Sequence, residues 1–316
     1  MAIDRWGRGA TLAFVAVAMA GCDTLSLLLG FPEPVVAVHS ALPVELAYRE
    51  GRGGIVLLTG RVNGKADVDF VLDTGAPVTV LIDGARTAAL ALDSTRARKL
   101  GPADDPAVPV GALQPGTSLA FGDVDLSGLT AVVLPEAALA CPERYRALDF
   151  AGVIGADLFR RFVVEVDPPA RRVRLHDPAR WRPPEGAAVV PLHFRDGHPF
   201  VEATLALPAG ATLARRMHLD TGMNSALSLV AGSHEALPMP ADGEASTSCF
   251  VGGLREVRTG PALAVDVGGA RFDGVRPRFV RRGDAPRLQQ DGAIGSELLA
   301  SRRYAIDYPG RRLVLI

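Results

Sequence analysis

The sequence predicts an all-β protein built from two similar lobes with short helical turns. Three observations favour this fold class: an internal duplication, a composition rich in turn-forming residues, and short apolar runs separated by turns. The 316 residues include 34 Gly and 24 Pro, and 48% of them are hydrophobic. A chain of this length can bury two cores, and frequent turns favour short strands over long helices.

Two motifs each occur twice along the chain. An apolar strand runs into Asp73-Thr74-Gly75, and a second apolar strand runs into Asp220-Thr221-Gly222, 147 residues later (220 − 73). The segment GVIGADL at 152–158 recurs as GAIGSEL at 292–298, shifted by 140 residues (295 − 155). Self-similarity on this scale indicates two copies of one folding unit. We therefore expect two pseudo-symmetric lobes that face each other.

The N-terminus has the pattern of an export signal. Two arginines precede an apolar run from Ala10 to Ala20, which is too short alone to span a bilayer. The run ends at Ala20-Gly21-Cys22, which resembles a bacterial lipoprotein signal peptide, whose Cys becomes the lipidated first residue. We expect a signal peptide over 1–21 and a lipid on Cys22 that anchors the protein to the bacterial cell envelope, facing the periplasm. Cleavage without lipidation, giving a soluble secreted or periplasmic protein, is the alternative.

The remaining chain divides into a leader and the two lobes. Residues 22–49 form a Pro-containing leader, in which 35–46 is expected to make one strand that docks on the body. The N-terminal lobe is predicted over 50–185 and the C-terminal lobe over 186–316. They are joined at the Pro-rich stretch 182–186. We expect a monomer that contains both lobes.

Each lobe is predicted to begin with a hairpin that delivers its aspartate. The apolar run 55–62 meets Asn63-Gly64, a strong two-residue hairpin signal, before the strand that leads to Asp73. In the second lobe, the strand 200–207 turns into 213–219 and so reaches Asp220. The hairpin and the acid therefore occur in the same order in both halves.

A Gly- and Pro-rich stretch after each aspartate is a candidate flap. In the second lobe, Gly252 and Gly253 suit the positive φ values of a hairpin turn, and together with Phe250 they mark the clearer candidate. Its counterpart, 100–116, is predicted to be a loop or an irregular hairpin. Four further strands are predicted over 117–121, 130–134, 262–267 and 275–280. Each lobe then closes with its Ile-Gly segment, a helical turn and a final hairpin.

The paired Asp-Thr-Gly triplets and Ile-Gly segments together resemble the aspartic proteases. The resemblance is particularly to the bacterial retropepsin-like group, in a fused two-lobe form similar to pepsin, and it covers roughly residues 50–316. The distance from the aspartate to the Ile-Gly glycine is nearly equal in the two halves, at 82 residues (155 − 73) and 75 residues (295 − 220). The resemblance implies two acid-protease β-barrel lobes.

The resemblance also implies that Asp73 and Asp220 form a catalytic dyad in the cleft between the lobes. Two adjacent carboxyl groups cannot both ionise, so one keeps a proton while the other activates a water for attack on a peptide bond. The residues expected to support the dyad are Thr74, Gly75, Ala76, Thr221 and Gly222. Met223 departs from the family pattern, in which a small or hydroxyl residue follows the triplet.

These inferences predict an aspartic endopeptidase that acts on a peptide or protein substrate and uses no cofactor or metal. The alternative is a catalytically silent retropepsin-like module of the cell envelope that binds peptides or a partner protein. The formal net charge is −1, and the scattered basic residues give no footprint for nucleic acid. His193 and His198 lack the spacing of a zinc site.

Two smaller features have competing interpretations. Cys141 and Cys249, one in each repeat, could pair outside the cytoplasm, but burial as small apolar residues explains them equally well, and we interpret them as unpaired. His218 lies two residues before Asp220, where the first repeat has an apolar residue. A half-buried structural histidine, or one that tunes Asp220, therefore fits better than a general base for Ser225.

Overall fold

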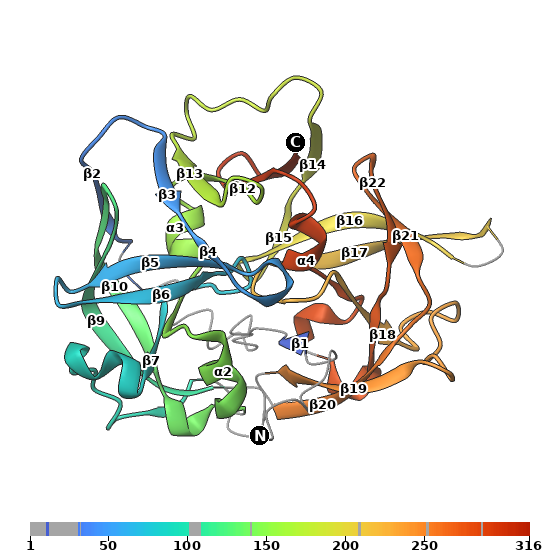
Figure 1. Ribbon diagram of the computed structural model, residues 1–316, viewed down its shortest axis with the longest axis horizontal. Coiled ribbons are helices and arrows are strands. Elements are labelled where there is room, and N and C mark those ends of the chain that lie inside the picture. Colours follow the sequence, from blue (N-terminus) through green and yellow to red (C-terminus); the bar gives the residue numbers. More distant parts are fainter. Residues whose placement is uncertain are drawn as a thin grey trace.

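The computed structural model describes residues 11–12, 31, 33–100, 109–139, 141–207, 210–250, 253–285 and 287–316. The protein is mostly β, with 52% strand and 11% helix, which confirms the predicted all-β class with two barrel-type lobes. In Figure 1 the first half of the chain (blue to green) lies beside the second half (yellow to red), and a third sheet lies across one end of both.

Six strands of the first lobe close into a barrel. Their order is β10-β7-β11-β6-β5-β9, and β9 pairs back with β10 to complete the ring. The predicted hairpin forms between β5 and β6, but Val62 pairs with Ala66, so its loop holds three residues instead of two. Asn63 and Gly64 take the positive φ values of this loop, 50° and 66°. The ring strands are β5 (Val56–Val62), β6 (Ala66–Leu72), β7 (Val80–Asp83), β9 (Val110–Phe121), β10 (Val124–Pro135) and β11 (Gly152–Ile154).

Shorter elements decorate this barrel. The loop or irregular hairpin expected over 100–116 is found only in part: β8 pairs with Gly111 and Val110, but 110–116 belongs to the long strand β9. Residues 101–108 between them lie outside the described residues. The short elements are β2 (Val35–Val38), β4 (Arg49–Glu50), η1 (Arg52–Gly54), η2 (Ala85–Leu90), β8 (Arg98–Lys99), η3 (Glu136–Ala138), α2 (Pro142–Leu148) and α3 (Ala156–Phe159).

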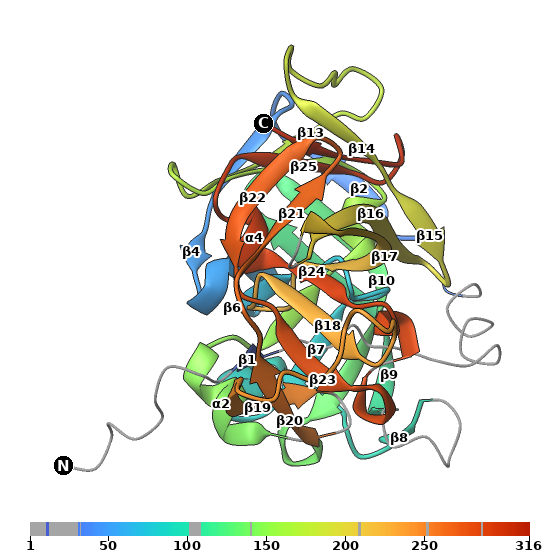
Figure 2. The ribbon, with the colours of Figure 1, turned by 90° about the vertical axis from the view of Figure 1, so that its right-hand side faces the viewer.

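The second lobe is an open sheet that Figure 2 shows from its outer side. Its order is β1-β19-β20-β23-β18-β24-β17-β16-β21-β22, with β15 paired to β16. Its strands are β1 (Thr11–Leu12), β15 (His193–Arg195), β16 (His198–Ala206), β17 (Thr212–Asp220), β18 (Leu227–Ala231), β19 (Glu244–Phe250), β20 (Gly253–Thr259), β21 (Leu263–Val267), β22 (Ala270–Val275), β23 (Arg278–Arg281) and β24 (Ala293–Gly295). Its helical turns are η5 (Arg282–Asp284), η6 (Arg287–Gln289) and α4 (Ser296–Leu299).

The two lobes share the arrangement that surrounds each aspartate. β11 pairs in parallel with β6 and antiparallel with β7. β24 pairs in the same two ways with β17 and β18. The second lobe has a strand break at a proline. The single strand expected over 275–280 is interrupted at Pro277, which lacks an N–H for the ladder, so β22 ends at Val275 and β23 begins at Arg278.

A third sheet joins the two halves. Its order is β14-β26-β25-β12-β13-β3, and the pairing of β12 with β25 crosses from one half to the other. The single strand expected over 35–46 is two strands in different sheets, because β2 joins β10 while β3 joins β13. The sheet consists of β3 (Val44–Ala47), β12 (Val163–Asp167), β13 (Arg172–His176), β14 (Ala188–Pro191), β25 (Tyr304–Asp307) and β26 (Arg312–Leu315).

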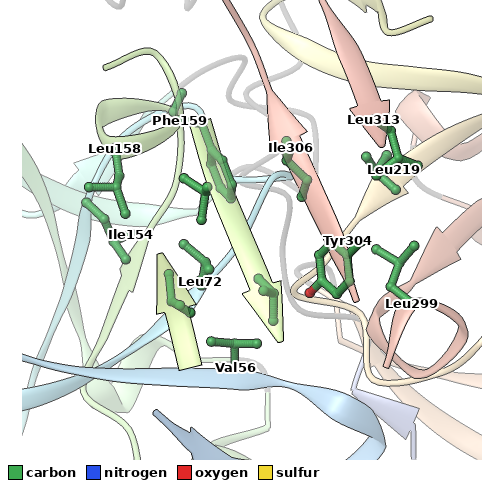
Figure 3. Packing of buried hydrophobic residues seen from close by; sticks show 14 of the residues in the cluster. Val56, Leu72, Ile154, Leu158, Phe159, Leu219, Leu299, Tyr304, Ile306 and Leu313 are labelled. Carbon is green, nitrogen blue, oxygen red and sulfur yellow. The ribbon is translucent and has the colours of Figure 1, made fainter. Parts of the chain in front are cut away.

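One large hydrophobic core contains buried residues from both halves of the chain. Figure 3 shows Leu72 and Phe159 of the first lobe on one side, with Leu219, Tyr304 and Ile306 of the second half opposite. All five are at most 2% exposed. Full burial of a side chain of this kind stabilises a fold by about 1.5–3 kcal/mol. The shared core therefore holds the two aspartate-bearing turns in a fixed relation.

A disulfide adds a covalent link between the halves. Cys141, just before α2, is bonded to Cys249 of β19, with their Cα atoms 6.3 Å apart. The interpretation of these cysteines as unpaired was wrong. Both side chains are buried, as expected, but the hairpin of β19 and β20 places Cys249 in an apolar cluster of the first lobe that also contains Tyr145 and Ala76. The tertiary fold thus brings together two thiols that the sequence separates by 108 residues.

Most of the predicted export signal lies outside the described residues. Cys22 and its neighbours are among those left out, so lipid attachment remains a prediction. Thr11–Leu12 form β1, which pairs in parallel with Ser248 and Cys249 of β19. Among the residues that the structure describes, no helix combines the length and the apolar character needed to cross a membrane.

Candidate active site

Each aspartate sits on a tight turn at the end of a buried strand. The turn after β6 carries Asp73, whose backbone N–H donates to Ile154 O at 2.9 Å, and β17 ends at Asp220. The Ile-Gly motifs pack directly against these turns. A Cβ atom on Gly155 would lie 2.1 Å from Ala76 O, and one on Gly295 would lie 2.1 Å from Ser225 O. Only glycine fits at these positions, which explains why each acid is accompanied by its own Ile-Gly segment.

The two turns are locked together by their threonines. Thr74 Oγ1 donates to Leu219 O at 2.6 Å, and Thr221 Oγ1 donates to Leu72 O at 2.8 Å. Each hydroxyl also accepts the backbone N–H of the opposite threonine, at 2.9 Å and 3.0 Å. All four bonds are buried and cross from one half to the other. This reciprocal arrangement fixes the relative position of Asp73 and Asp220.

The two carboxyl groups lie in this locked region with different hydrogen bonds. Asp73 Oδ1 accepts the backbone N–H of Gly75 at 2.7 Å and that of Gly222 at 3.1 Å. Asp220 Oδ2 accepts Nε2 of Gln289 at 2.9 Å. Both aspartates are 0% exposed. Within the described part of the chain, Asp73 Oδ2 and Asp220 Oδ1 have no hydrogen-bond partner, so these oxygens can accept one from a water or a ligand.

Burial is the main cause that raises the pKa values of both acids. Removal from water, followed by the nearby charge of Asp220, raises the pKa of Asp73 well above its ordinary value. Burial also raises the pKa of Asp220 to about 7, against the opposing effect of its hydrogen bonds. Because the groups interact strongly, the two proton losses belong to the pair and not to one residue. A singly protonated pair can supply both an acid and a base.

Two histidines lie behind Asp220. His218 is fully buried, not half-buried as expected, and its Nδ1 is 3.9 Å from Asp220 Oδ2. The ring of His198 lies 5.6 Å from that of His218. Burial lowers the pKa of His198 to about 4 and that of His218 well below its ordinary value, so both rings are neutral near pH 7. His218 therefore faces Asp220 as a neutral ring and not as a charged one.

The structure groups most of the residues predicted for the site. Gly75, Ala76 and Gly222 are buried beside the acids. The predicted hairpin of the candidate flap is also present, because Phe250 pairs with Gly253 at its tip, where Gly253 has φ +111°. Gly252 lies outside the described residues.

Sequence reasoning missed two residues that contact the paired turns. Gln289 donates to Asp220, and Tyr308 Oη donates to Thr74 O at 3.0 Å. Neither has a motif of its own, although Gln289 stands three residues before Gly292, where the second Ile-Gly segment begins and a search could have started. In the described ranges, no group of three or more His, Cys, Asp or Glu side chains is placed to hold a metal ion.

The comparison with known families agrees with this geometry. Residues 58–158, which include Asp73 and most of the first barrel, match the family model described as aspartyl protease. The match supports a general aspartic protease function for the chain and a retropepsin-like first lobe. It does not extend to Asp220. A search of the curated proteins finds no match.

Proposed function

We propose that this protein is an aspartic endopeptidase that hydrolyses a peptide or protein substrate between its lobes with the Asp73/Asp220 pair. The observation that carries the proposal is the reciprocal bonding of Thr74 and Thr221, which binds the two acid-bearing turns to each other. Reciprocal bonding of equivalent residues is typical of a two-fold interface, and it supports a pair made of one acid from each copy. The family match of the first lobe supports the same reaction.

In the proposed reaction, the charged carboxylate accepts a proton from a water as that water attacks the peptide carbonyl carbon. The protonated carboxyl group donates its proton to the carbonyl oxygen, giving a neutral tetrahedral intermediate. In the breakdown step, the carboxyl group that took the proton from water donates it to the amide nitrogen, and the C–N bond breaks. One hydroxyl group of the intermediate gives its proton to the other carboxylate, so the products are a carboxylic acid and an amine and the pair is again singly protonated. The free oxygens Asp73 Oδ2 and Asp220 Oδ1 are the atoms assigned to these transfers.

The hairpin of β19 and β20 is proposed as the flap over the substrate. Phe250 and Gly253 pair at the tip of this hairpin, which the Cys141–Cys249 disulfide ties to the first lobe, and Gly252 remains a predicted flap residue outside the described residues. Because the two acids are buried, a substrate must displace part of the cover over them. The hairpin is attached to the first lobe by the disulfide and to the second lobe by the pairing of β20 with β23. These attachments are expected to limit how far the hairpin can move away from the acids, and so to favour extended, unfolded peptides as substrates.

The direct test is digestion of a diverse peptide mixture, followed by mass spectrometry of the products. The proposal predicts cleavage at internal peptide bonds, insensitive to chelators. The competing proposal is a silent module that binds peptides without cleaving them. Peptides that are retained on the protein but recovered intact across the whole pH range would overturn the endopeptidase and support the silent module.

The pH dependence of cleavage follows from the raised pKa values of the pair. Activity needs one proton on the two acids, so it falls on the acid side, where both are protonated, and on the alkaline side, where neither is. With the pKa of Asp220 at about 7 and that of Asp73 well above its ordinary value, we expect the acid limb of kcat/KM near neutral pH and the optimum above it. Activity that is highest in the range where free aspartates titrate would contradict this expectation.

We also propose that the mature protein is lipid-anchored at Cys22 and faces the periplasm, with the disulfide as a compatible feature because disulfides persist in oxidising compartments. Cells labelled with a radioactive fatty acid should yield labelled protein in the membrane fraction, and Cys22→Ser should remove the label. The Cys141→Ala/Cys249→Ala variant is the matched control and should keep it. Label that survives Cys22→Ser contradicts lipid attachment at this residue.

A further inference from the structure

Gln289 is a buried polar residue that the internal duplication does not account for. It is the last residue of η6 and is 3% exposed. Its Nε2 donates to Asp220 Oδ2 at 2.9 Å, whereas its Oε1 has no partner among the described residues. Burying an amide is costly unless its polar atoms are bonded, and a bond to a charged group repays more of that cost than a bond to a neutral one. The contact with Asp220 is therefore the interaction that explains a glutamine here.

The surrounding structure holds Gln289 in place. Leu288 packs against Phe200 of β16, and its carbonyl oxygen accepts a hydrogen bond from Arg195 Nη2 at 3.4 Å. The carbonyl oxygen of Gln289 accepts the backbone N–H of Gly292 at 3.0 Å. The segment is thus fixed on both sides of the glutamine, and its side chain is directed to the acid by the fold.

Among the described residues of the first lobe, no side-chain amide donates to Asp73. The residue 140 positions earlier is Asp149, which is exposed and forms an ion pair with Arg86 at 2.8 Å. Asp73 instead accepts two backbone N–H groups. Ala76 and Met223, which follow the two triplets, have no side-chain N–H or O–H to offer. Gln289 is therefore an asymmetric addition to an otherwise duplicated site.

We propose that Gln289 is a positioning residue of the acid pair: its amide N–H fixes the carboxylate of Asp220 and favours the singly charged state of the pair. The proposal rests on the proposed endopeptidase function, which gives that state its role. An amide N–H at this oxygen stabilises a carboxylate and not a protonated acid. Its effect is expected in the first proton loss of the pair as a whole.

Apart from Asp73, the ionisable side chains near Asp220 do not supply this stabilisation. The backbone N–H groups of Met223 and Gly222 also lower the pKa of Asp220, and the amide of Gln289 adds to their effect. The histidines of β16 and β17, His198 and His218, are neutral because burial lowers their pKa values. Tyr308 donates its hydroxyl to Thr74 O and not to Asp220. Arg195 of β15 lies over the ring of Phe200, with Cζ 4.7 Å from the ring centroid, and donates to Leu288 O.

The test compares Gln289→Met, which keeps the side-chain length and removes the donor, with the wild type. Loss of a hydrogen bond to a charged group is expected to move the acid limb of kcat/KM to higher pH by about 1–2 units. KM should change little, since the amide contacts the acid and not the substrate. The matched control is Gln290→Met, at the exposed neighbouring glutamine, which should leave the profile in place. A Gln289→Met profile that superimposes on that of the wild type overturns the proposal.

A second measurement separates this proposal from the endopeptidase function itself. The ¹³C resonances of the Asp73 and Asp220 carboxyl groups can be titrated without substrate, and the first proton loss should occur at higher pH in Gln289→Met. If the wild type cleaves no peptide but this shift is present, the role of Gln289 stands and the endopeptidase proposal fails. If Gln289→Met does not fold, Gln289→Leu, which also removes the donor but has a shorter side chain, is titrated instead. It should show an upward shift as well, and an unchanged titration overturns the proposal.

Discussion

Replacing either Asp73 or Asp220 by Asn is expected to reduce turnover by at least about 10²–10⁴-fold, the range typical of acid and base groups. Asn has the shape of Asp but cannot exchange the proton that the proposed reaction passes between the two acids. Because the acids work as one unit, the double variant should be little worse than either single variant. The measurement is kcat/KM on a peptide that the wild type cleaves. Activity near that of the wild type in either single variant would refute the shared-dyad mechanism.

The same variants should retain or gain stability, which distinguishes lost chemistry from lost structure. Burial raises the pKa values of both acids, so the folded state binds protons more tightly than the unfolded state. Folding therefore suffers no penalty from ionisation of the pair below the ordinary Asp pKa. A penalty develops as the pH rises through the raised values. A neutral Asn avoids it, so Asp73→Asn and Asp220→Asn should unfold at the wild-type temperature or above it in alkaline buffer.

A matched control for these substitutions is Asp67→Asn. Asp67 lies on β6, the strand that leads to Asp73, but its side chain is 53% exposed and pairs with Arg61 at 3.1 Å. An exposed ion pair of this kind contributes about 0–1 kcal/mol. Both turnover and unfolding temperature should therefore stay close to those of the wild type. A large loss of activity in this control would show that Asn substitution on β6 acts through the strand and not through the dyad.

Removal of the disulfide is expected to have the largest effect on stability. The bond joins residues 108 positions apart, so it restricts a long loop in the unfolded chain. The chain-entropy relation assigns about 4.7 kcal/mol to a loop near this length, and measured losses are about 2–5 kcal/mol. Cys141→Ala/Cys249→Ala should lower the free energy of unfolding by an amount in this range. Alanine is the appropriate replacement because both cysteines are buried in an apolar cluster, where a serine hydroxyl would lack a partner.

Chemical reduction provides the internal control for this prediction. A reductant should lower the unfolding midpoint of the wild type toward that of the double variant and leave the double variant unchanged. Amide exchange should rise most in β19 and β20, because the bond ties their hairpin to the first lobe. A wild type whose midpoint does not respond to full reduction would contradict the assigned stabilising role.

The sequence by itself determined the elements with strong local signals. Asn63-Gly64 indicated the hairpin before Asp73, because these residues accept the positive φ values that a tight turn needs. Gly155 and Gly295 marked the segments that pack against the acid-bearing turns, since no side chain fits there. The repetition of these signals predicted two lobes, and the all-β class followed. Where a local signal was overlooked, at Pro277, the predicted strand was wrong.

Only the tertiary structure decided the contacts that join distant parts of the chain. The pairing of Cys141 with Cys249, the sheet shared by β12 and β25, and the contact of Gln289 with Asp220 have no local pattern. Each depends on how two already formed units pack, and packing is specified by shape and burial over the whole core and not by neighbouring residues. The duplication predicted symmetry at the site, whereas Gln289, placed by the helical turn η6 of one lobe, makes the environments of the two acids unequal.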